Sequence, residues 1–243
     1  MAGISDEEAI KLLEPFTSCD VSDALSKLMA EDAGAFGQLT DIRQVIPSPH
    51  ADLEARVCGP AFTMEFVAAS SPTPTPAAPT QPWHHMDQAP PGSVVVMAYP
   101  PSPNAVFGGL MAARCKALGV RGAVVVGRVR DMRELLATGV PVFAAGTSTL
   151  GLAPFVRLAG VGGSVTVRTP ATGVEGEVPV PPVHVATGDI ILADCDGVVR
   201  IPRALVRRVA ALAARNTEID ARCMADIRAG SSIAAAFVAH RGK

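Results

Sequence analysis

The chain has 243 residues and a formal net charge of −2, and 49% of its residues are hydrophobic while 18% are charged. This balance is typical of a soluble protein with a substantial core, and it excludes a broad nucleic-acid-binding face, which needs clustered Lys and Arg. We therefore expect no nucleic-acid partner. No uninterrupted apolar run approaches the roughly 18 residues of a membrane span, so we also expect no membrane partner.

The beginning of the chain predicts two short helices. Ser5, with a glutamate three residues later, has the form of a capping box and predicts a helix to about residue 13. A second helix is expected over about 21–29, with Ser18 or Asp20 as its cap.

Two features indicate a cytoplasmic protein. The N-terminus is acidic and lacks the basic region and apolar core of a secretory signal. The five cysteines have neither C-x-x-C spacing nor histidine partners at zinc spacing, and an odd number without a framework indicates a reducing compartment. We expect the cysteines to be small buried hydrophobic residues rather than nucleophiles.

The region that follows combines irregular segments with one strand. Residues 34–50 are expected to be irregular, and residues 57–67 alternate like a strand with a Gly-Pro interruption near their start. Residues 70–92 are so rich in proline that they exclude a regular element and predict an extended surface insertion.

Two adjacent histidines, His84 and His85, lie in this insertion. Their adjacency favours opposite side-chain directions over a shared metal ion. With Trp83 and Asp87 they could line the mouth of a pocket, but solvated loop residues are the more common outcome of such a pattern.

The middle of the chain predicts a β-α-β unit, with a buried strand over 93–99, a helix over 112–118 and a second strand over 123–126. Phe107-Gly108-Gly109-Leu110-Met111 opens the helix. After the second strand we expect a short helix and a further strand over 140–146.

The C-terminal part is expected to be rich in strands and then helical. The predicted strands cover 165–167, 178–185, 190–192 and 198–201, and the predicted helices cover about 203–226 and the tail to residue 243. Asp194-Cys195-Asp196-Gly197 invites a metal interpretation but lacks the remaining oxygen ligands of a calcium loop, so a β-turn is favoured. The basic stretch from Arg203 to Arg215 has apolar residues at helical spacing, which predicts the wet face of an amphipathic helix.

The chain shows no long linker and no internal repeat, so residues 1–243 are expected to form a single α/β domain. This domain would carry N-terminal helices at about 5–30, the Pro-rich insertion at about 70–92 and a C-terminal helical tail at about 203–243.

The residues that most strongly suggest a reaction centre follow the strand over 123–126. Arg130 and Asp131 come soon after this strand, and Glu134 lies three residues beyond Asp131, so the two carboxylates would face the same way on a first helical turn. Two carboxylates can hold a hard divalent cation through oxygen, while an arginine pairs with an anionic substrate. Open α/β folds tend to keep their sites at this edge of the sheet.

A pair of glycines, Gly108 and Gly109, opens the preceding helix. Such a start exposes unpaired backbone N–H groups at the positive end of the helix, where a carboxylate or phosphate can approach the main chain closely. The pattern lacks both G-x-G-x-x-G and a Lys-Ser/Thr pair, so neither a dinucleotide nor a nucleoside triphosphate is indicated. In parallel β-α-β geometry this loop and Arg130-Asp131 lie at the same end of the sheet.

The same charges also have an alternative interpretation as an ordinary surface. Neighbouring opposite charges are common, and Arg128, Arg133 and Glu134 could complete a solvated face with Arg130 and Asp131. The position directly after a buried strand favours a site, but the residues alone leave both interpretations open.

Gly109, twenty intervening residues, Arg130-Asp131, two more residues and Glu134 spell the pattern G-x20-R-D-x2-E. In this pattern the chain resembles the 4-hydroxy-4-methyl-2-oxoglutarate aldolase / regulator of ribonuclease activity A (RraA-like) family. The resemblance covers roughly residues 12–210, and the stretches that agree with it include 17–25, 139–146 and 188–199.

The resemblance implies a swivelling β/β/α sandwich that assembles as a homotrimer or as a hexamer of two trimers, with sites at subunit boundaries. It also implies a divalent-metal-dependent lyase, a class II pyruvate aldolase. Such an enzyme cleaves 4-hydroxy-4-methyl-2-oxoglutarate or 4-carboxy-4-hydroxy-2-oxoadipate to pyruvate and a second oxo acid, with oxaloacetate decarboxylation as a side activity.

The resemblance further implies a role for each residue of the pattern. Asp131 would ligate Mg²⁺ or Mn²⁺, and Glu134 would hold the metal directly or through a water. Arg130 would act in catalysis by binding the substrate and its developing enolate. The pyruvyl carboxylate would be received by the backbone at the helix start, at Gly108, Gly109, Leu110 and Met111.

Two other functions and one other mechanism fit the sequence less well. The ribonuclease-regulator branch of the family implies a non-catalytic protein-binding ring, but a binding module has no need of the retained acids. A methyltransferase acting on a quinone is disfavoured because no glycine-rich cofactor loop follows the first strand. A Schiff-base route would need a buried lysine, and none sits in the proposed site among Lys11, Lys27, Lys116 and Lys243.

Overall fold

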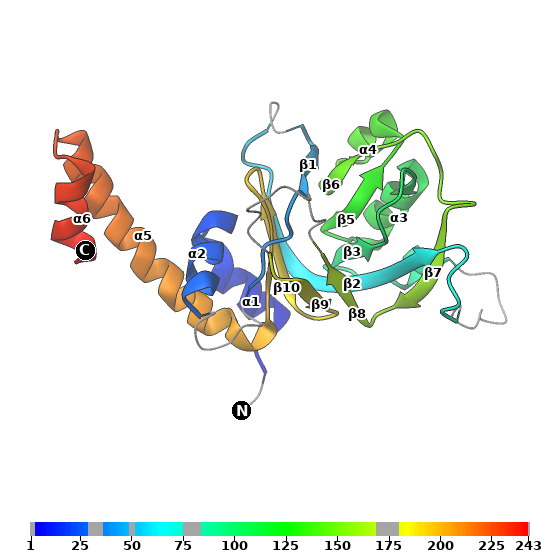
Figure 1. Cartoon of the computed structure of the whole chain (residues 1–243), viewed down its shortest axis with the longest axis horizontal. Helices are drawn as coiled ribbons and strands as arrows, with labels where there is room; N and C mark the ends of the chain where they lie inside the picture. Colours follow the sequence, from blue (N-terminus) through cyan, green and yellow to red (C-terminus); the bar gives the residue numbers. More distant parts are fainter. Residues whose placement is uncertain (1–2, 29–35, 49–51, 75–83, 169–179, 243) are drawn as a thin grey trace, which may run out of the picture.

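A computed structural model of the chain describes residues 3–28, 36–48, 52–74, 84–168 and 180–242. These residues form a mixed α/β fold around one large sheet that curls into a nearly closed barrel (Figure 1). The predicted α/β sandwich is therefore confirmed.

Parallel strands form the centre of the sheet, in the spatial order β6-β5-β3-β2. They are β2 (Val57–Ala68), β3 (Val94–Ala98), β5 (Gly122–Val129) and β6 (Val142–Thr147). Helix α3 (Gly109–Leu118) leads from β3 to β5, and α4 (Met132–Thr138) leads from β5 to β6. Because β3 and β5 are parallel neighbours, the predicted β-α-β unit is confirmed.

Antiparallel strands extend this centre on both sides. On one side β1 (Arg43–Ile46) pairs with β6. On the other side β10 (Ile190–Asp194) pairs with β2, and β11 (Gly197–Ile201) pairs with β10.

The two outer strands of this sheet approach each other. The segment before β1 forms a bridge to β11, in which the Leu39 N–H donates to the Val198 carbonyl at 2.9 Å and the Arg200 N–H donates to the Gly37 carbonyl at 2.7 Å. These bonds nearly close the barrel and satisfy backbone groups that an open edge would expose.

Shorter strands complete the fold. At the rim, β4 (Ala105–Phe107) pairs with β5, and β7 (Val156–Val161) pairs with β2. A separate two-stranded sheet consists of β8 (Ser164–Val167) and β9 (Val183–Ala186). The sequence patterns did not predict β4 and β7, because β4 has only three residues and β7 is only half-buried, without an alternation of buried and exposed positions.

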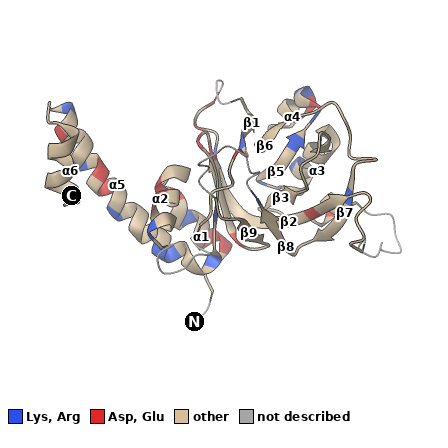
Figure 2. Cartoon of the chain, in the orientation of Figure 1, with Lys and Arg blue, Asp and Glu red and all other residues tan. Residues whose placement is uncertain are grey.

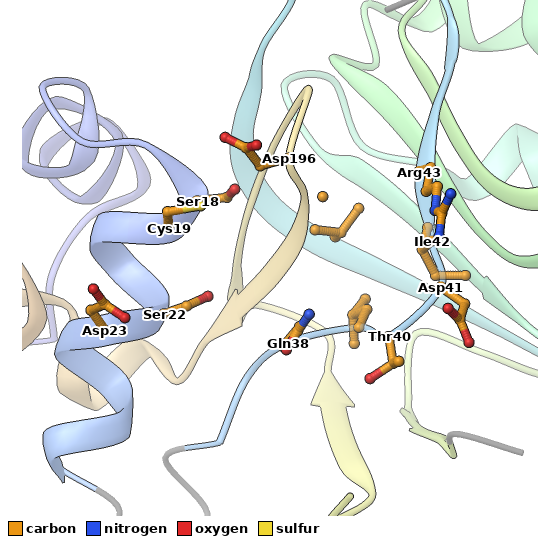
Figure 3. A pocket seen from close by; sticks show the side chains of 13 residues that line it. Ser18, Cys19, Ser22, Asp23, Gln38, Thr40, Asp41, Ile42, Arg43 and Asp196 are labelled. Carbon is orange, nitrogen blue, oxygen red and sulfur yellow. The ribbon is translucent and has the colours of Figure 1, made fainter. Parts of the chain in front are cut away.

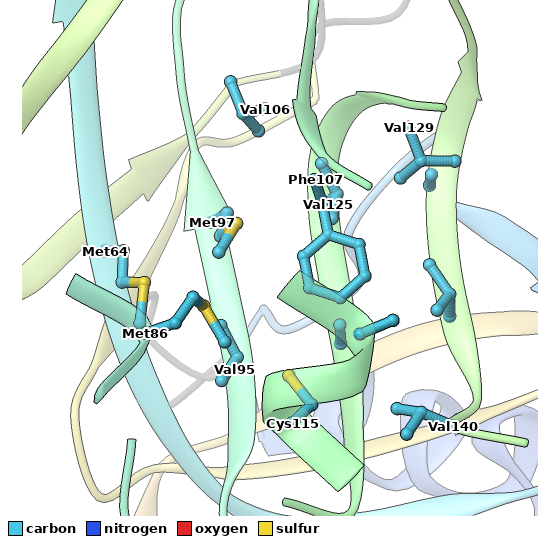
Figure 4. Packing of buried hydrophobic residues seen from close by; sticks show 14 of the residues in the cluster. Met64, Met86, Val95, Met97, Val106, Phe107, Cys115, Val125, Val129 and Val140 are labelled. Carbon is cyan, nitrogen blue, oxygen red and sulfur yellow. The ribbon is translucent and has the colours of Figure 1, made fainter. Parts of the chain in front are cut away.

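Three apolar clusters hold the layers together. One lies between the sheet and helices α3 and α4, where Phe107, Met97 and Val125 pack with Cys115 (Figure 4). A second fills the inside of the barrel around Val96, Val124 and Phe143 of the central strands. The third joins β10 and β11 to the N-terminal helices and to the beginning of the last long helix.

The N-terminal helices are α1 (Asp6–Leu13) and α2 (Ser18–Leu28). The predicted cap of α1 is confirmed, since the Ser5 hydroxyl accepts the Glu8 N–H at 3.2 Å. The prediction that the second helix starts at residue 21 was wrong. It starts at Ser18 because Thr17 and Asp20 form a local capping box, in which the Thr17 hydroxyl accepts the Asp20 N–H at 3.2 Å and the Asp20 carboxylate accepts the Thr17 N–H at 2.9 Å. Asp194, in the distant β10–β11 hairpin, adds to this cap by accepting both the N–H and the hydroxyl of Ser18 at 2.7 and 2.6 Å.

The C-terminal helices form an arm that extends away from the barrel (Figure 1). A 3-10 turn (Arg203–Leu205) leads into α5 (Val206–Arg228), and α6 (Ile233–Arg241) folds back on the end of α5. Basic and acidic side chains alternate along this arm (Figure 2), and Val206, Val209 and Ala213 form its buried side near the barrel. The prediction of an amphipathic basic helix is confirmed. Within the described part of the chain, no helix has the length and apolar character needed to cross a bilayer.

Two sequence predictions for the region before β3 were wrong. Residues 34–50 were expected to be irregular, yet residues 43–46 form β1 because they find an antiparallel partner in β6. Residues 70–92 were expected to contain no regular element, yet a 3-10 helix (His85–Gln88) forms there, with His84 and Asp87 making a capping box. Residues 75–83, including Trp83, lie outside the described residues.

Candidate functional site

The candidate site begins where β5 ends. The Arg130 N–H still donates to the Phe107 carbonyl at 3.0 Å, which holds Arg130 beside β4. The next residue, Asp131, has φ 60° and ψ 45°, a left-handed conformation that is uncommon outside glycine, and it forms the N-cap of α4. This sharp turn directs the Asp131 carboxylate toward the start of α3 rather than along the strand.

The two glycines of the α3 start lie directly against the two acids. The Gly109 N–H donates to Asp131 Oδ2 at 3.2 Å. A Cβ atom added at Gly108 would lie 2.5 Å from the same oxygen, and one added at Gly109 would clash with the Glu134 carboxylate. Glycine is therefore required here by close approach, and Asp131 and Glu134 meet at one helix start, as the sequence predicted.

Arg130 lies on the exposed side of this group. Its Nε is 3.5 Å from Asp131 Oδ2, and the side chains of Arg130 and Asp131 are 44% and 37% exposed. Its guanidinium covers Gly151, where an added Cβ would lie 2.7 Å from Nη1. An ion pair this long and this exposed adds little stability, so folding alone gives no strong reason for the arrangement.

The start of α3 also offers backbone donors. Gly108 has no side chain with which to cap the helix, and at such a start the N–H groups of the first turn point out of the helix. These groups belong to Gly109, whose N–H already donates to Asp131 Oδ2, and to Leu110 and Met111. Leu110 is 79% exposed, so the positive end of α3 is open to a ligand.

The donor set fits a hard divalent cation. Asp131 and Glu134 supply carboxylate oxygens on an exposed surface, and Mg²⁺ usually binds through one or two carboxylates while keeping several waters. The glycine contacts place the Asp131 carboxylate against Gly108 and the Glu134 carboxylate against Gly109, two adjacent residues at the start of α3.

A second acidic group lies in the β10–β11 hairpin, where one ligand atom from each of Asp194, Cys195 and Asp196 lies within 4.8 Å of the others. The expected β-turn is confirmed there, since residues 195–196 connect two paired antiparallel strands. Both Asp194 oxygens already accept hydrogen bonds, from Ser18 and from the Asp196 N–H at 3.1 Å. We therefore assign this hairpin a structural role.

Beside this hairpin is a polar pocket of about 400 Å³ between α2 and the segment before β1 (Figure 3). Ser18, Cys19 and Ser22 line it from α2, and Gln38 and Thr40 line it from the other side. Sequence reasoning missed this pocket because its walls come from segments that are far apart in the chain.

A larger cavity of about 1010 Å³ lies at the C-terminal ends of the parallel strands. Its walls include the ends of β2, β3, β5 and β6, which is where open α/β folds bind ligands. Tyr99 and Arg128 line this cavity. Sequence reasoning placed Arg128 only on a solvated face, although its position two residues before Arg130 was a usable signal.

The histidine pair is not the solvated loop feature that we expected. The rings of His84 and His85 lie together with centroids 3.8 Å apart, so the predicted opposite directions were wrong. His85 packs edge-on against Phe66 at 5.4 Å, and burial lowers the pKa of His85 to about 4. His85 is therefore a neutral, partly buried packing residue.

The cysteines are unsuited to nucleophilic catalysis. All five are free thiols, and burial raises the pKa of Cys58 to about 11 and that of Cys115 to about 12. The expectation of buried hydrophobic residues is confirmed for Cys115 and Cys223, whereas Cys19 is exposed.

Known proteins are similar to this chain in sequence and in fold. The family profile described as RraA-like (Aldolase/RraA) matches residues 18–200. A protein from Halalkalibacterium halodurans, provisionally named 4-hydroxy-4-methyl-2-oxoglutarate aldolase, is 31% identical over 149 residues. That alignment covers 61% of this chain and 60% of the relative, so the chain aligns with less than two thirds of that protein.

Solved structures show a similar architecture. An uncharacterised protein from Pseudomonas syringae superposes with a TM-score of 0.71 at 24% identity, covering 97% of this chain and 99% of that one. A Streptomyces coelicolor protein, described as an unusual member of the RNase ES inhibitor RraA family, superposes with a TM-score of 0.63 at 21% identity, covering 95% of this chain and 100% of that one. Because the family profile matches well over half of its residues, this chain belongs to the RraA-like family, which includes aldolases and ribonuclease inhibitors.

Proposed function

We propose that the protein is a divalent-metal-dependent carbon–carbon lyase. It would cleave 4-hydroxy-4-methyl-2-oxoglutarate or 4-carboxy-4-hydroxy-2-oxoadipate to pyruvate and a second oxo acid, and it would also decarboxylate oxaloacetate. The observation that carries the proposal is the meeting of Asp131, Glu134 and Arg130 at the open start of α3.

The residues of the candidate site would have separate roles. Asp131 and Glu134 would hold Mg²⁺ or Mn²⁺, which supplies a Lewis acid for the electrons of the breaking bond. The Leu110 and Met111 N–H groups of α3 would bind the pyruvyl carboxylate, because they are donors at the positive end of a helix. Arg130 would direct a fixed positive charge at the oxygen on which negative charge grows.

A coupled assay for pyruvate tests the proposal. The wild-type protein should release pyruvate from 4-hydroxy-4-methyl-2-oxoglutarate, lose this activity with EDTA and regain it with added Mg²⁺ or Mn²⁺. Arg130→Ala should lower kcat/KM by about 100-fold or more, because it removes the donor aimed at the developing charge.

Arg133→Ala is the matched control, since Arg133 is an exposed arginine of the same segment. The side chains nearest to Gly108 and Gly109 are those of Arg130, Asp131 and Glu134 instead. Arg133→Ala should retain near wild-type turnover. Activity that persists without metal, or an Arg130→Ala variant as active as the control, would contradict the proposal.

A non-catalytic binding ring is the second candidate function. Its support is the C-terminal arm, which exposes the apolar side chains of Met224, Ile233 and Val238 at 49%, 60% and 65%. Exposed apolar groups of this kind mark surfaces that bind other proteins. Capture of a ribonuclease by the wild-type protein, together with absent lyase turnover, would favour this candidate.

A further inference from the structure

Arg128 is an arginine that the proposed chemistry does not use, yet it lies beside the candidate site. Successive side chains of an extended strand alternate, so Arg128 and Arg130 face the same side, with Cα atoms about 7 Å apart. Arg128 lies against Gly146 and donates from Nη1 to the Thr147 carbonyl at 3.0 Å, while Arg130 lies against Gly151. The two guanidiniums therefore follow one another along the end of β6 and the segment after it.

A backbone irregularity sets the position of Arg128. The pairing of β5 with β6 shifts register between Val125 and Arg128, and Gly127 has φ 150°. A side chain at Gly127 would be strained and would clash with the Tyr99 ring. Bulges near functional sites commonly redirect a side chain, and here the redirected residue lines the large cavity.

Tyr99 holds this bulge in place. Its hydroxyl donates to the Asn104 carbonyl at 2.8 Å and accepts the Arg128 N–H. Asn104 is buried, the bond to the Arg128 N–H is partly buried, and Tyr99 itself is only 9% exposed. The backbone of Arg128 is therefore fixed while its side chain remains exposed at the cavity.

We propose that Arg128 binds a second carboxylate of the substrate, so that the site selects oxo acids with a carboxylate at the far end of the chain. This inference rests on the proposed function for the position of the pyruvyl group. A guanidinium has five N–H donors, and the bond to Thr147 uses one, so a fork of donors remains for a carboxylate.

The remaining cavity walls agree with such a ligand. They are mostly apolar and include Phe66 and Pro100, which suit the carbon chain between two carboxylates. Arg168, Glu65 and Asp41 also line the cavity, so the walls as a whole carry no net charge. Of the two arginines in these walls, Arg128 is the one that lies two residues from Arg130, so we assign the anion preference to it.

Calorimetric titration with two unreactive ligands tests the inference. 2-Oxoadipate carries the pyruvyl group and a distal carboxylate, whereas 2-oxohexanoate has the same chain length without that carboxylate. Neither has the 4-hydroxyl that cleavage requires. With Mg²⁺ present, wild type should bind 2-oxoadipate at least about 10-fold more tightly, as expected for a charge-assisted hydrogen bond.

Variants assign this preference to Arg128. Arg128→Met should bind both ligands equally, Arg128→Lys should recover part of the preference, and Arg133→Met should retain all of it. Tyr99→Phe should reduce the preference without removing it, because Tyr99 is a positioning residue.

Equal binding by wild type, binding of neither ligand, or a preference that survives in Arg128→Met would overturn the inference. A wild-type preference that Arg128→Met loses, in a protein that releases no pyruvate from hydroxy-oxo acids, would support the distal anion site and reject the proposed lyase.

Discussion

At the scale of single residues, the candidate site depends on two glycines that have no side chain. Gly109 lacks the Cβ that would clash with Glu134, and Gly108 lacks the one that would crowd Asp131. The hydrogen bond from the Gly109 N–H to Asp131 exists only because the main chain comes this close. The arrangement of the acids is thus encoded as much by absent side chains as by the carboxylates themselves.

Gly109→Ala should therefore displace Glu134 and lower kcat/KM by about 100-fold, the effect expected of a misplacement of about 1 Å. Its matched control is Gly163→Ala, because a Cβ at Gly163 meets nothing within 4 Å. Steady-state kinetics of both variants, with circular dichroism to verify folding, makes the comparison. Equal losses in the two variants would contradict the account.

Sequence alone could predict much of this site. The glycine pair, Arg130, Asp131 and Glu134 were all identified, because in a β-α-β unit the loops after successive parallel strands share one edge. The cavity beside them could not be predicted. It depends on the bulge at Gly127 and on Tyr99, whose contacts join residues that no local pattern connects.

At the scale of elements, long-range contacts decide where helices and strands begin. Helix α2 starts at Ser18, where a local capping box of Thr17 and Asp20 is joined by Asp194 from a hairpin far along the chain. Strand β1 forms because β6 offers an antiparallel edge. The Asp194 contact and the β6 edge are not local signals, whereas the caps and apolar periods that predicted α1, β2 and β3 are local and were read correctly.

Asp194→Ala should destabilise the fold by about 2 kcal/mol, because it leaves the buried Ser18 N–H and hydroxyl without their acceptor. Asp196→Ala is the control, since Asp196 is exposed, and its effect should stay within about 0.5 kcal/mol. Urea denaturation measures both. Similar values for the two variants would mean that Asp194 does not cap α2 in solution.

At the scale of the whole molecule, helices α3 and α4 and the barrel share continuous apolar clusters, while α6 packs mainly on α5. We propose that residues 1–243 fold as one domain with a projecting helical arm. A homotrimer or a hexamer of trimers stays a prediction, and the exposed apolar residues of the arm are consistent with a further surface that assembly would cover.

Acid should weaken the whole fold through His85. Burial lowers its pKa from 6.5 to about 4, so between these values the unfolded chain binds the proton more readily than the folded one. Stability should therefore fall as the pH drops from about 6.5 toward 4. In His85→Phe, which keeps an aromatic ring beside Phe66, the decline should be shallower.

Thermal unfolding across this pH range compares His85→Phe with wild type, and His184→Phe serves as a control on an exposed strand position. An equal pH dependence in wild type and His85→Phe would exclude His85 as the source of the acid sensitivity.

The most direct test of the central claim is a crystal structure with Mn²⁺ and oxalate, an unreactive mimic of the pyruvate enolate. Anomalous scattering should place the ion at Asp131 and Glu134, with oxalate between the start of α3 and the Arg130 guanidinium. An ion bound instead at the hairpin of Asp194 and Asp196, or oxalate bound away from Arg130, would contradict the account.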